Sequence, residues 1–330
     1  MHQIELRGSY FEMGRQQGLL LRGWQVPALE PQMARFALRC REELAEHAPE
    51  LLEELHGLAE AAGLDPEALI DFSLTCPFDD SELPDAGCTV LAVLPERAAD
   101  NRTIVGRNYD YFYDSSQEGA TIYRTYPEGR YASLGNCDIW VGREDGLNEA
   151  GLFVAQAAFF TRGLQPGLAF WFIVRLLLDR CATVDEGLDL ILRLPHAASW
   201  TYLLADRSGN AAAVEPTVKG IEVRYPVDGL LVMTNHAVCS CWAGTEEFIP
   251  PDSRPRFRRL RELLGKGPAV DVAAVKGALT DHQGLVCSHG DHFPQRPFGT
   301  LWSVVGRPGE RQLEIAAGQP CCTAYQTLGF

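Results

Sequence analysis

The stretch DAGCTVLAVLPERAADNRTIVGRNYDYFYD, residues 85–114, holds two apolar runs separated by a polar turn. The two runs predict β-strands over residues 89–94 and 103–108. If the strands pair as a hairpin, the numbers of opposed residues sum to roughly 196 to 198, which sets Cys88 opposite residues 108–110. The hairpin therefore brings Arg107, Asn108 and Asp110 beside a cysteine at the start of a strand.

These neighbours suggest a reactive thiol. An arginine beside a cysteine lowers the thiol pKa, and a carboxylate in reach orients an amine or accepts a proton. No histidine lies near Cys88 in the sequence to act as its base. A cysteine at a chain terminus carries its own base, since an α-amino group has an ordinary pKa of about 7.7 to 8.0.

Such a terminus requires that the Gly87–Cys88 bond be cut. Gly87 suits this reaction, because a residue without a Cβ accepts strained backbone and leaves its carbonyl open to attack by the thiol. A thioester formed there and then hydrolysed would free the amine of Cys88. The sequence therefore predicts self-cleavage between Gly87 and Cys88.

Composition limits the possible classes of protein. The chain has 330 residues, a formal net charge of −15, 46% hydrophobic and 22% charged residues, which predicts a folded protein with a large core. The acidic balance argues against nucleic-acid partners, which need clustered Lys and Arg. The N-terminus lacks the pattern of a secretory signal, so we expect a cytoplasmic protein whose ten cysteines are mostly reduced. Arg175 interrupts the longest apolar run, so we expect no membrane span.

Periodicity divides the chain near Cys88. Residues 1 to about 75 are predicted to be mainly helical, with one amphipathic pattern from Leu44 to Ala62 that stops at Gly63 and a short helix that opens at Asp65–Pro66. Strand patterns then dominate, interrupted by paired helices near 168–181 and 184–194 and near 254–264 and 270–280. Two strands near 300–306 and 311–316 end the pattern. This grouping predicts an α+β sandwich of layered sheets covered by helices.

Five motifs in order carry a family resemblance. GCT is followed by GRNYDYF, GLNEAGLFV, MTNH and DSRPRFRRLRELL, and LRGSYFEMGRQQG lies near the N-terminus. Together they resemble the penicillin (isopenicillin N) acyltransferase family of N-terminal-nucleophile hydrolases, which mature by self-cleavage before a cysteine. The resemblance implies a four-layer αββα sandwich. It also implies a leader, residues 1–87, before a catalytic domain, residues 88–330. Because the amphipathic helices of the leader bury apolar faces, we expect it to stay bound after the cut.

The resemblance assigns roles residue by residue. Cys88 matches the nucleophile and Asp110 the acid that holds its amine, while Arg107 matches an arginine of the related bile-salt hydrolases. Asn235 matches the side-chain donor to the oxyanion, and Asn148 a second donor; such a donor supplies about 3 kcal/mol. Buried packing, a hairpin salt bridge and turn or strand-end capping are the plainer interpretations of these residues.

One position departs from the family pattern. An arginine usually follows a VC or IC dipeptide late in the chain, where this chain has Ser288 and His289. Two alternatives follow: Arg296 substitutes from nearby, or the charge is absent. The departure bears on processing and on substrate class, and His289 is predicted to lie at the rim of the substrate site together with Tyr109, Tyr111 and Phe112.

The predicted function is an autoproteolytically activated cysteine amidohydrolase or acyltransferase for a small-molecule amide or acyl thioester. No metal or organic cofactor is expected, although acyl-CoA is a possible acyl donor. One alternative is a metal-dependent hydrolase built on residues 281–292, although their spacing fits no established zinc motif. The others are a binding protein that has lost activity and an uncleaved thiol hydrolase with His236 or His289 as its base.

Overall fold

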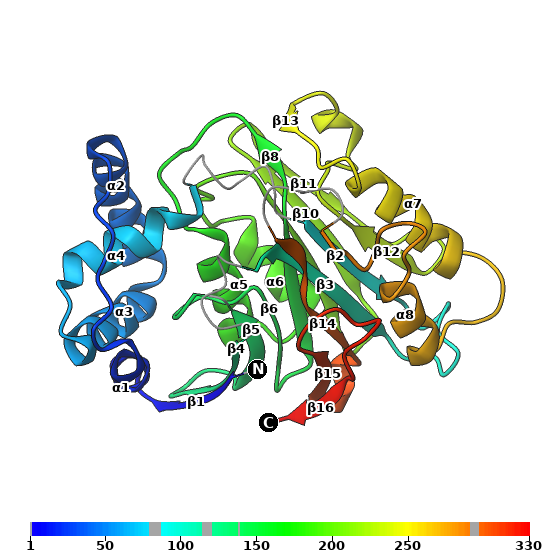
Figure 1. The fold of residues 1–330 in the computed structure, drawn as a ribbon, viewed down its shortest axis with the longest axis horizontal. Helices are drawn as coiled ribbons and strands as arrows, with labels where there is room; N and C mark the ends of the chain where they lie inside the picture. The colour runs from blue at the N-terminus through cyan, green and yellow to red at the C-terminus, as the bar shows by residue number, and fades with distance from the viewer. Residues whose placement is uncertain (1, 79–86, 114–120, 138, 291–296) are drawn as a thin grey trace.

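The computed structural model describes residues 2–78, 87–113, 121–137, 139–290 and 297–330. Two β-sheets lie face to face between helices (Figure 1). The eight-stranded sheet has, in spatial order, β1 (His2–Gly8), β4 (Thr121–Pro127), β5 (Ser133–Cys137), β6 (Asp145–Asn148), β7 (Leu152–Ala158), β9 (Trp200–Asp206), β10 (Ala211–Thr217) and β11 (Gly220–Arg224). The six-stranded sheet has β12 (Leu230–Met233), β2 (Gly87–Val93), β3 (Ile104–Phe112), β14 (Phe298–Gly306), β15 (Gln312–Ala316) and β16 (Gln326–Gly329).

Three apolar cores separate four layers. One lies between the two sheets, and the six-stranded sheet packs its other face on α7 (Ser253–Leu264) and α8 (Val272–Leu279). The eight-stranded sheet packs its outer face on α5 (Phe170–Arg180) and α6 (Val184–Ile191). The predicted αββα sandwich is therefore confirmed. A small sheet of β8 (Phe160–Thr161) and β13 (Glu246–Phe248) completes the described strands.

Side-chain alternation in β2 assigns each residue to a layer. Val90 and Ala92 belong to the core between the sheets, whereas Leu91 and Val93 belong to the core beneath α7 and α8. Cys88 shares the face of Val90, and Thr89 shares the face of Leu91. The thiol of Cys88 thus points between the sheets.

In the N-terminal segment, the amphipathic pattern predicted from Leu44 to Ala62 belongs to two helices. The pattern divides at Ala48 into α2 (Pro31–His47) and α3 (Pro49–Ala62), because proline lacks an N–H and begins a new helix. The ends are as predicted: α3 stops at Gly63, with φ of 72°, and Asp65 caps α4 (Pro66–Thr75) through the backbone N–H of Glu67. Short α1 (Tyr10–Gly18) precedes them.

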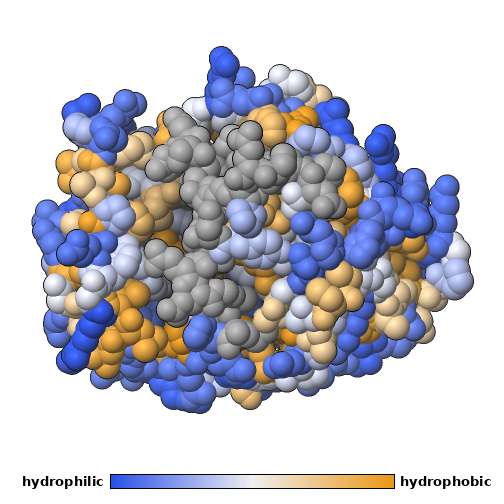
Figure 2. Space-filling view, in the orientation of Figure 1, coloured by the Kyte–Doolittle hydropathy of each residue, from blue (hydrophilic) through white to orange (hydrophobic). Residues whose placement is uncertain are grey.

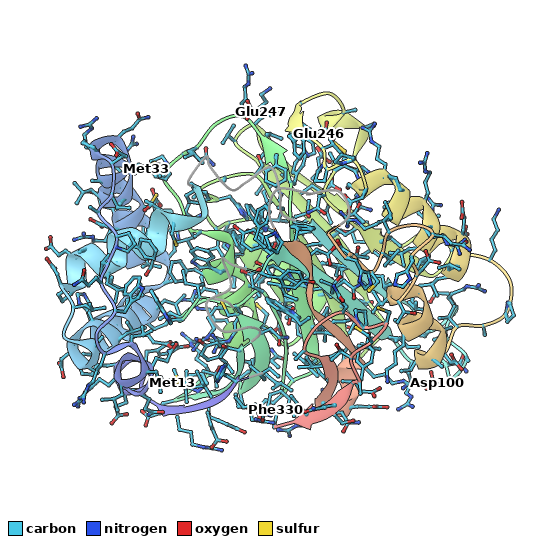
Figure 3. The ribbon with its side chains drawn as sticks, in the orientation of Figure 1. Met13, Met33, Asp100, Glu246, Glu247 and Phe330 are labelled. Carbon is cyan, nitrogen blue, oxygen red and sulfur yellow. A yellow bond between two sulfur atoms is a disulfide. The ribbon has the colours of Figure 1, made fainter. Side chains whose placement is uncertain are left out.

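Strand β1 was not predicted, because its alternation is mostly exposed. It pairs in parallel with β4 and forms an edge of the eight-stranded sheet. The helices that follow it lie at the left of Figure 1, where Met13 and Met33 mark them in Figure 3, and the face in Figure 2 has hydrophobic surface on that side. The segment before Cys88 is therefore part of the sandwich.

A buried ionic cluster joins this segment to the helix α5. Glu54 of α3 forms an ion pair with Arg175 at 3.1 Å, and Arg175 also pairs with Asp179 at 2.8 Å. The hydroxyl of Tyr10 donates to Asp179 at 2.9 Å, and Gln17 donates to Glu54 at 2.7 Å. Removal of one partner from such a cluster costs about 3 to 5 kcal/mol, so the contact holds the two parts of the chain together.

Among the described residues, no helix combines the length and the apolar character that a membrane crossing needs.

Candidate active site

The hairpin of β2 and β3 has the register predicted from the sequence. Cys88 pairs with Tyr109, and Gly87 pairs with Asp110. Arg107 lies two residues along β3 from the partner of Cys88, on the same face of the sheet. Its guanidinium Nη2 lies 3.7 Å from the Cys88 sulfur.

Two carboxylates share the guanidinium of Arg107. Asp145 at the start of β6 forms an ion pair with it, and Glu144 lies 3.6 Å away. The indole of Trp302 donates to Asp145 at 2.9 Å, and the ring of Tyr109 stacks on Trp302 with the ring centroids 4.0 Å apart. These side chains fill the space between the two sheets beside the thiol.

The net effect on the thiol differs from the sequence-based prediction. Burial raises the pKa of Cys88 to about 11, and Arg107 opposes that shift without reversing it. Cys88 is only 2% exposed, so loss of hydration disfavours the thiolate more than one shared arginine favours it. In the uncut chain the sulfur is therefore a neutral thiol at neutral pH.

The backbone nitrogen of Cys88 has its own partners. It donates to Oδ1 of Asn235 at 2.8 Å, and the same oxygen accepts from Nη2 of Arg256 at 2.8 Å. Nη1 of Arg256 donates to the carbonyl of Cys88 and, at 3.0 Å, to the hydroxyl of Thr89. Two donors therefore fix the orientation of the Asn235 amide, with its oxygen toward Cys88.

The amide nitrogen of Asn235 faces the other way. One of its two hydrogens goes to the carbonyl of Ala158 at 3.1 Å. The backbone N–H of Asn235 donates to Ser253 at 2.9 Å, which holds the residue at the end of β12. The structure thus places Asn235 beside Cys88, and among the described residues the second amide hydrogen of Asn235 has no hydrogen-bond acceptor, while its role toward substrate stays a prediction.

Asp110 lies on the other face of β3, next to Gly87. Its Oδ1 accepts from the Thr300 hydroxyl at 2.6 Å, whereas Oδ2 is buried without a hydrogen-bond partner among the described residues. Burial raises the pKa of Asp110 to about 7, against the opposing effects of Arg256 and Thr300. A carboxyl with this pKa exchanges a proton readily near neutral pH.

Gly87 allows a close approach of Asp110 to the backbone. A Cβ at residue 87 would lie 3.0 Å from the Cβ of Asp110 and 3.2 Å from its Oδ2. A larger side chain would therefore push Asp110 away from the bond between Gly87 and Cys88.

Asn148 has a different place from the one predicted. Its two amide hydrogens go to the carbonyls of Leu178 and Cys181 at 2.8 and 2.6 Å, and its oxygen accepts from the N–H of Leu152 at 2.9 Å. No hydrogen is left for an oxyanion, so the prediction of a second donor at Asn148 is wrong. The residue ties the turn between β6 and β7 to the end of α5.

The aromatic residues predicted to bind substrate differ in exposure. Tyr109 and Phe112 are buried, Tyr111 is partly exposed, and the side chain of His289 lies on the surface. Their roles toward substrate remain predictions. Arg296, the predicted substitute for the family arginine, lies outside the described residues.

The two histidines considered as bases have other contacts. Nδ1 of His236 lies 2.8 Å from the Ser253 hydroxyl, and burial, with Arg254 and Arg256 nearby, lowers its pKa to about 4. His289 contacts His282, Cys287 and Cys321. Among the described contacts of the Cys88 sulfur, the partner is Arg107 and neither histidine.

Arg256 is the residue that sequence reasoning missed. It is one of five arginines in the motif DSRPRFRRLRELL, and their spacing in the sequence alone does not single it out. The buried positions of α7 are Ser253, Arg256, Leu260 and Leu264, which follow helical spacing. The sequence did contain a signal for Arg256, because it lies among the apolar positions of the predicted helix. A guanidinium buried there needs polar partners.

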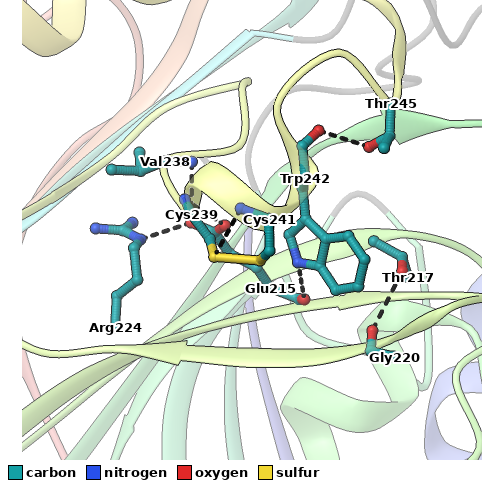
Figure 4. Close-up of a disulfide and its surroundings, with 9 residues drawn as sticks. All are labelled: Glu215, Thr217, Gly220, Arg224, Val238, Cys239, Cys241, Trp242 and Thr245. Carbon is teal, nitrogen blue, oxygen red and sulfur yellow. Dashed lines mark hydrogen bonds and ion pairs between the residues drawn. A yellow bond between two sulfur atoms is a disulfide. The ribbon is translucent and has the colours of Figure 1, made fainter.

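The segment Cys239–Ser240–Cys241 also differs from expectation. The sequence predicts reduced thiols, whereas the structure joins Cys239 and Cys241 by a disulfide beside Trp242 (Figure 4). A surface cavity of about 460 Å³ adjoins Trp242, Lys219 and Arg162. None of the residues around Cys88 described above lines this cavity.

The four-layer αββα sandwich is the fold of the N-terminal-nucleophile hydrolase class. The model of the acyl-coenzyme A:6-aminopenicillanic acid acyl-transferase family matches residues 97–321, and the chain belongs to that family. The matched region begins after Cys88, so it includes Arg107, Asp110, Asn235 and Arg256 but not the cysteine. No curated protein sequence matches the chain.

Solved structures show the same fold. A variant of conjugated bile acid hydrolase from Clostridium perfringens is 14% identical with a TM-score of 0.53, covering 74% of this chain and 97% of that chain. Penicillin V acylase from Agrobacterium tumefaciens is 18% identical with a TM-score of 0.53, covering 70% of this chain and 83% of that chain. At these identities the likeness concerns the fold alone.

Proposed function

We propose that the chain is a precursor that cuts itself between Gly87 and Cys88 and then acts as a cysteine amidohydrolase or acyltransferase. The observation that carries the proposal is the position of Asp110. Its Oδ2 is buried, unpartnered among the described residues and adjacent to Gly87, while the backbone nitrogen of Cys88 is held by Asn235. These groups surround the bond that must break and the amine that must form.

The first reaction is intramolecular. The Cys88 sulfur attacks the carbonyl carbon of Gly87 and its proton leaves to a base, for which the pKa of about 7 at Asp110 is suitable. The C–N bond breaks, the nitrogen takes up a proton and a thioester remains. Water then cleaves the thioester, which gives a carboxylate at Gly87, the free thiol and the α-amine of Cys88.

The mature reaction uses the same groups on an outside substrate. The α-amine takes the thiol proton as the sulfur attacks an amide or thioester carbonyl, and the proton passes to the leaving group. Asn235 offers its remaining amide hydrogen to the oxyanion, and Asp110 with the amide oxygen of Asn235 holds the new ammonium group. The acyl-enzyme passes to water in hydrolysis or to an amine in transfer.

The substrate class follows from the family. The family is named for an acyl-coenzyme A donor and an amine acceptor, 6-aminopenicillanic acid, so acyl thioesters and small acyl amides are the compounds to test. The bile acid hydrolase and the penicillin V acylase have the same fold, which makes amide hydrolysis the parallel candidate.

The leader, residues 1–87, is proposed to stay in place after the cut. It supplies β1 to the eight-stranded sheet, and Glu54 and Tyr10 to the buried cluster around Arg175. Its release would expose these charges and the apolar faces of its helices, which is costly.

The deciding experiment is the intact mass of the denatured protein beside a Cys88→Ala variant. The expected result is two fragments, residues 1–87 and 88–330, from the native sequence and one uncut chain from the variant. A single uncut chain in both samples would refute self-cleavage. A thiol-directed acyl probe that labels Cys88 of the cut protein, followed by acyl amides and thioesters as substrates, then tests the second reaction.

A further inference from the structure

Four potential metal ligands outside the Cys88 site converge on one point. The ligand atoms of His282, Cys287, His289 and Cys321 all lie within 4.8 Å of one another. The first three belong to the connection between α8 and β14, whereas Cys321 belongs to the connection between β15 and β16. The folded chain thus adds a fourth ligand to a segment whose own spacing fits no zinc motif.

Nε2 of His289 has more polar neighbours than one ring nitrogen can hydrogen-bond. It lies 3.2 Å from Nε2 of His282, 3.2 Å from the Cys321 sulfur and 3.6 Å from the Cys287 sulfur. A neutral ring nitrogen has either one hydrogen or one lone pair, so it satisfies one of these three neighbours. A cation shared by all four groups satisfies every one of them.

The spacing also fits tetrahedral coordination. Zinc bonds of about 2.0 to 2.1 Å to nitrogen and about 2.3 Å to sulfur place two nitrogens about 3.3 Å apart and a nitrogen and a sulfur about 3.6 Å apart. The observed N–N separation is 3.2 Å, and the two N–S separations are 3.2 and 3.6 Å. The other three pairs of ligand atoms lie within 4.8 Å, and His282, His289 and Cys321 are exposed, so rotations of these three side chains can bring the atoms toward a tetrahedron with the buried Cys287 sulfur.

We propose that His282, Cys287, His289 and Cys321 bind one Zn²⁺ ion. Two imidazoles and two thiolates form a closed set of four protein ligands, which is typical of structural zinc and leaves no position for a reactive water. The site therefore differs from the metal-dependent hydrolase considered for residues 281–292. Its role is to tie two connections of the six-stranded sheet together.

The surrounding hydrogen bonds hold the ligands in place. Asp281 pairs with Arg259 at 2.9 Å, accepts from the N–H of Gly284 at 2.7 Å, and accepts from the N–H of Cys287 at 3.0 Å through its carbonyl. The backbone N–H of Cys321 donates to the sulfur of Cys287. Such outer contacts orient metal ligands and stabilise bound thiolates.

The proposed ion also bears on Asp110. Ser288, between two of the ligands, donates its N–H to the Thr300 hydroxyl at 3.0 Å and accepts the Thr300 N–H at 3.1 Å. The Thr300 hydroxyl in turn donates to Asp110 at 2.6 Å. Zinc at this site would fix Ser288 and, through Thr300, the position of the Asp110 carboxyl.

Metal content tests the proposal without requiring any activity. The full chain is purified in the uncut Cys88→Ala background, incubated with Zn²⁺ under reducing conditions, desalted and analysed for zinc by mass spectrometry. About one zinc per chain is expected for this parent and for Cys322→Ser, whose neighbouring exposed sulfur contacts Gln319 instead of the cluster. Cys321→Ser and His282→Ala are expected to lose most of it.

Cobalt reports the ligands directly, so a variant that loses zinc only through misfolding is recognised. Co²⁺ in the parent and in Cys322→Ser is expected to show intense tetrahedral bands and a thiolate charge-transfer band, with a raised Tm. In Cys321→Ser the charge-transfer band weakens while the circular dichroism stays native. Equal zinc in Cys321→Ser and its parent, no retained zinc in the parent, or a Cys287–Cys321 disulfide in freshly purified protein would each overturn the proposal. All these readouts are independent of whether the native chain cuts itself.

Discussion

The guanidinium of Arg256 donates a hydrogen bond to Oδ1 of Asn235 at 2.8 Å, and this contact decides which way the Asn235 amide faces. With Oδ1 held by an arginine and by the N–H of Cys88, the amide nitrogen must point away from both. A residue of α7 therefore sets the hydrogen-bonding pattern at the start of β2. Asp252 completes the arrangement through an ion pair with Arg256 at 3.1 Å.

The first prediction concerns Arg256→Lys. Lysine keeps the charge but cannot donate hydrogen bonds to Asn235, Thr89 and the Cys88 carbonyl at the same time, since all its donors are on one nitrogen. Misplacement of the amide is expected to slow self-cleavage by about 10²-fold. Intact mass at successive times after a refolding step measures the rate. The control is Arg254→Lys, an exposed arginine of the same helix, and equal rates for the two variants would contradict the role of Arg256.

A second prediction concerns pH. The pKa of Asp110 is raised from 3.8 to about 7, so between these values the folded chain keeps a proton that the unfolded chain has lost. The contribution of Asp110 to stability therefore falls as pH rises toward about 7, with a slope of at most about 1.4 kcal/mol per pH unit. Asp110→Asn removes this contribution.

Urea unfolding of Cys88→Ala, with and without Asp110→Asn, measures the effect between about pH 5 and 8. The difference in free energy of unfolding between the two chains is expected to change with pH and to level off above the folded pKa. A difference that is constant over the range would show that the carboxyl of Asp110 titrates normally.

A third prediction tests the contact between the leader and the helix α5. Glu54→Gln leaves Arg175 without one of its two buried carboxylates, so the free energy of unfolding of the uncut chain is expected to fall by about 3 kcal/mol. Glu53→Gln, at the exposed neighbouring position, is expected to change it by less than about 0.5 kcal/mol. In the cut protein, gel filtration should show less leader retained by Glu54→Gln than by Glu53→Gln, and equal retention would contradict the role of the cluster.

A fourth prediction separates the two asparagines. Asn148→Ala leaves the carbonyls of Leu178 and Cys181 without their donor, and each unsatisfied group costs about 1 to 3 kcal/mol. Stability is expected to fall while the rate of self-cleavage, measured well below the unfolding temperature, stays the same. Asn235→Ala is expected to lower that rate by about 10² to 10³-fold. A comparable loss of rate in Asn148→Ala would instead support the earlier prediction that Asn148 is an oxyanion donor.

The hairpin register shows what local pattern can predict. Two apolar runs and the loop between them were enough to place Cys88 opposite residues 108–110, and the structure pairs it with Tyr109, because pairing between adjacent strands depends on chain spacing. Helix ends at Gly63 and Asp65 were equally local. Strand β1 was not predicted because its pairing partner β4 is more than a hundred residues away and its mostly exposed side chains give no periodic pattern.

The site shows where such prediction stops. Asn148 and Asn235 are alike in sequence as asparagines near strand ends, and the carbonyls that meet Asn148 come from a distant helix. The pKa of Cys88 was expected to fall because Arg107 is near. The degree of burial, and the two carboxylates that share this arginine, are properties of the packed sandwich.

The amino-acid sequence by itself determined the pairing of β2 with β3 and the identity of the β3 residues beside Cys88, since these follow from spacing along the chain. Only the tertiary structure decided that Arg256 orients Asn235, that Asp110 is buried beside Gly87 and that Cys321 lies beside His282, Cys287 and His289. Those contacts join segments far apart in the chain. Their distances and their burial depend on how sheets and helices pack, which no local pattern records.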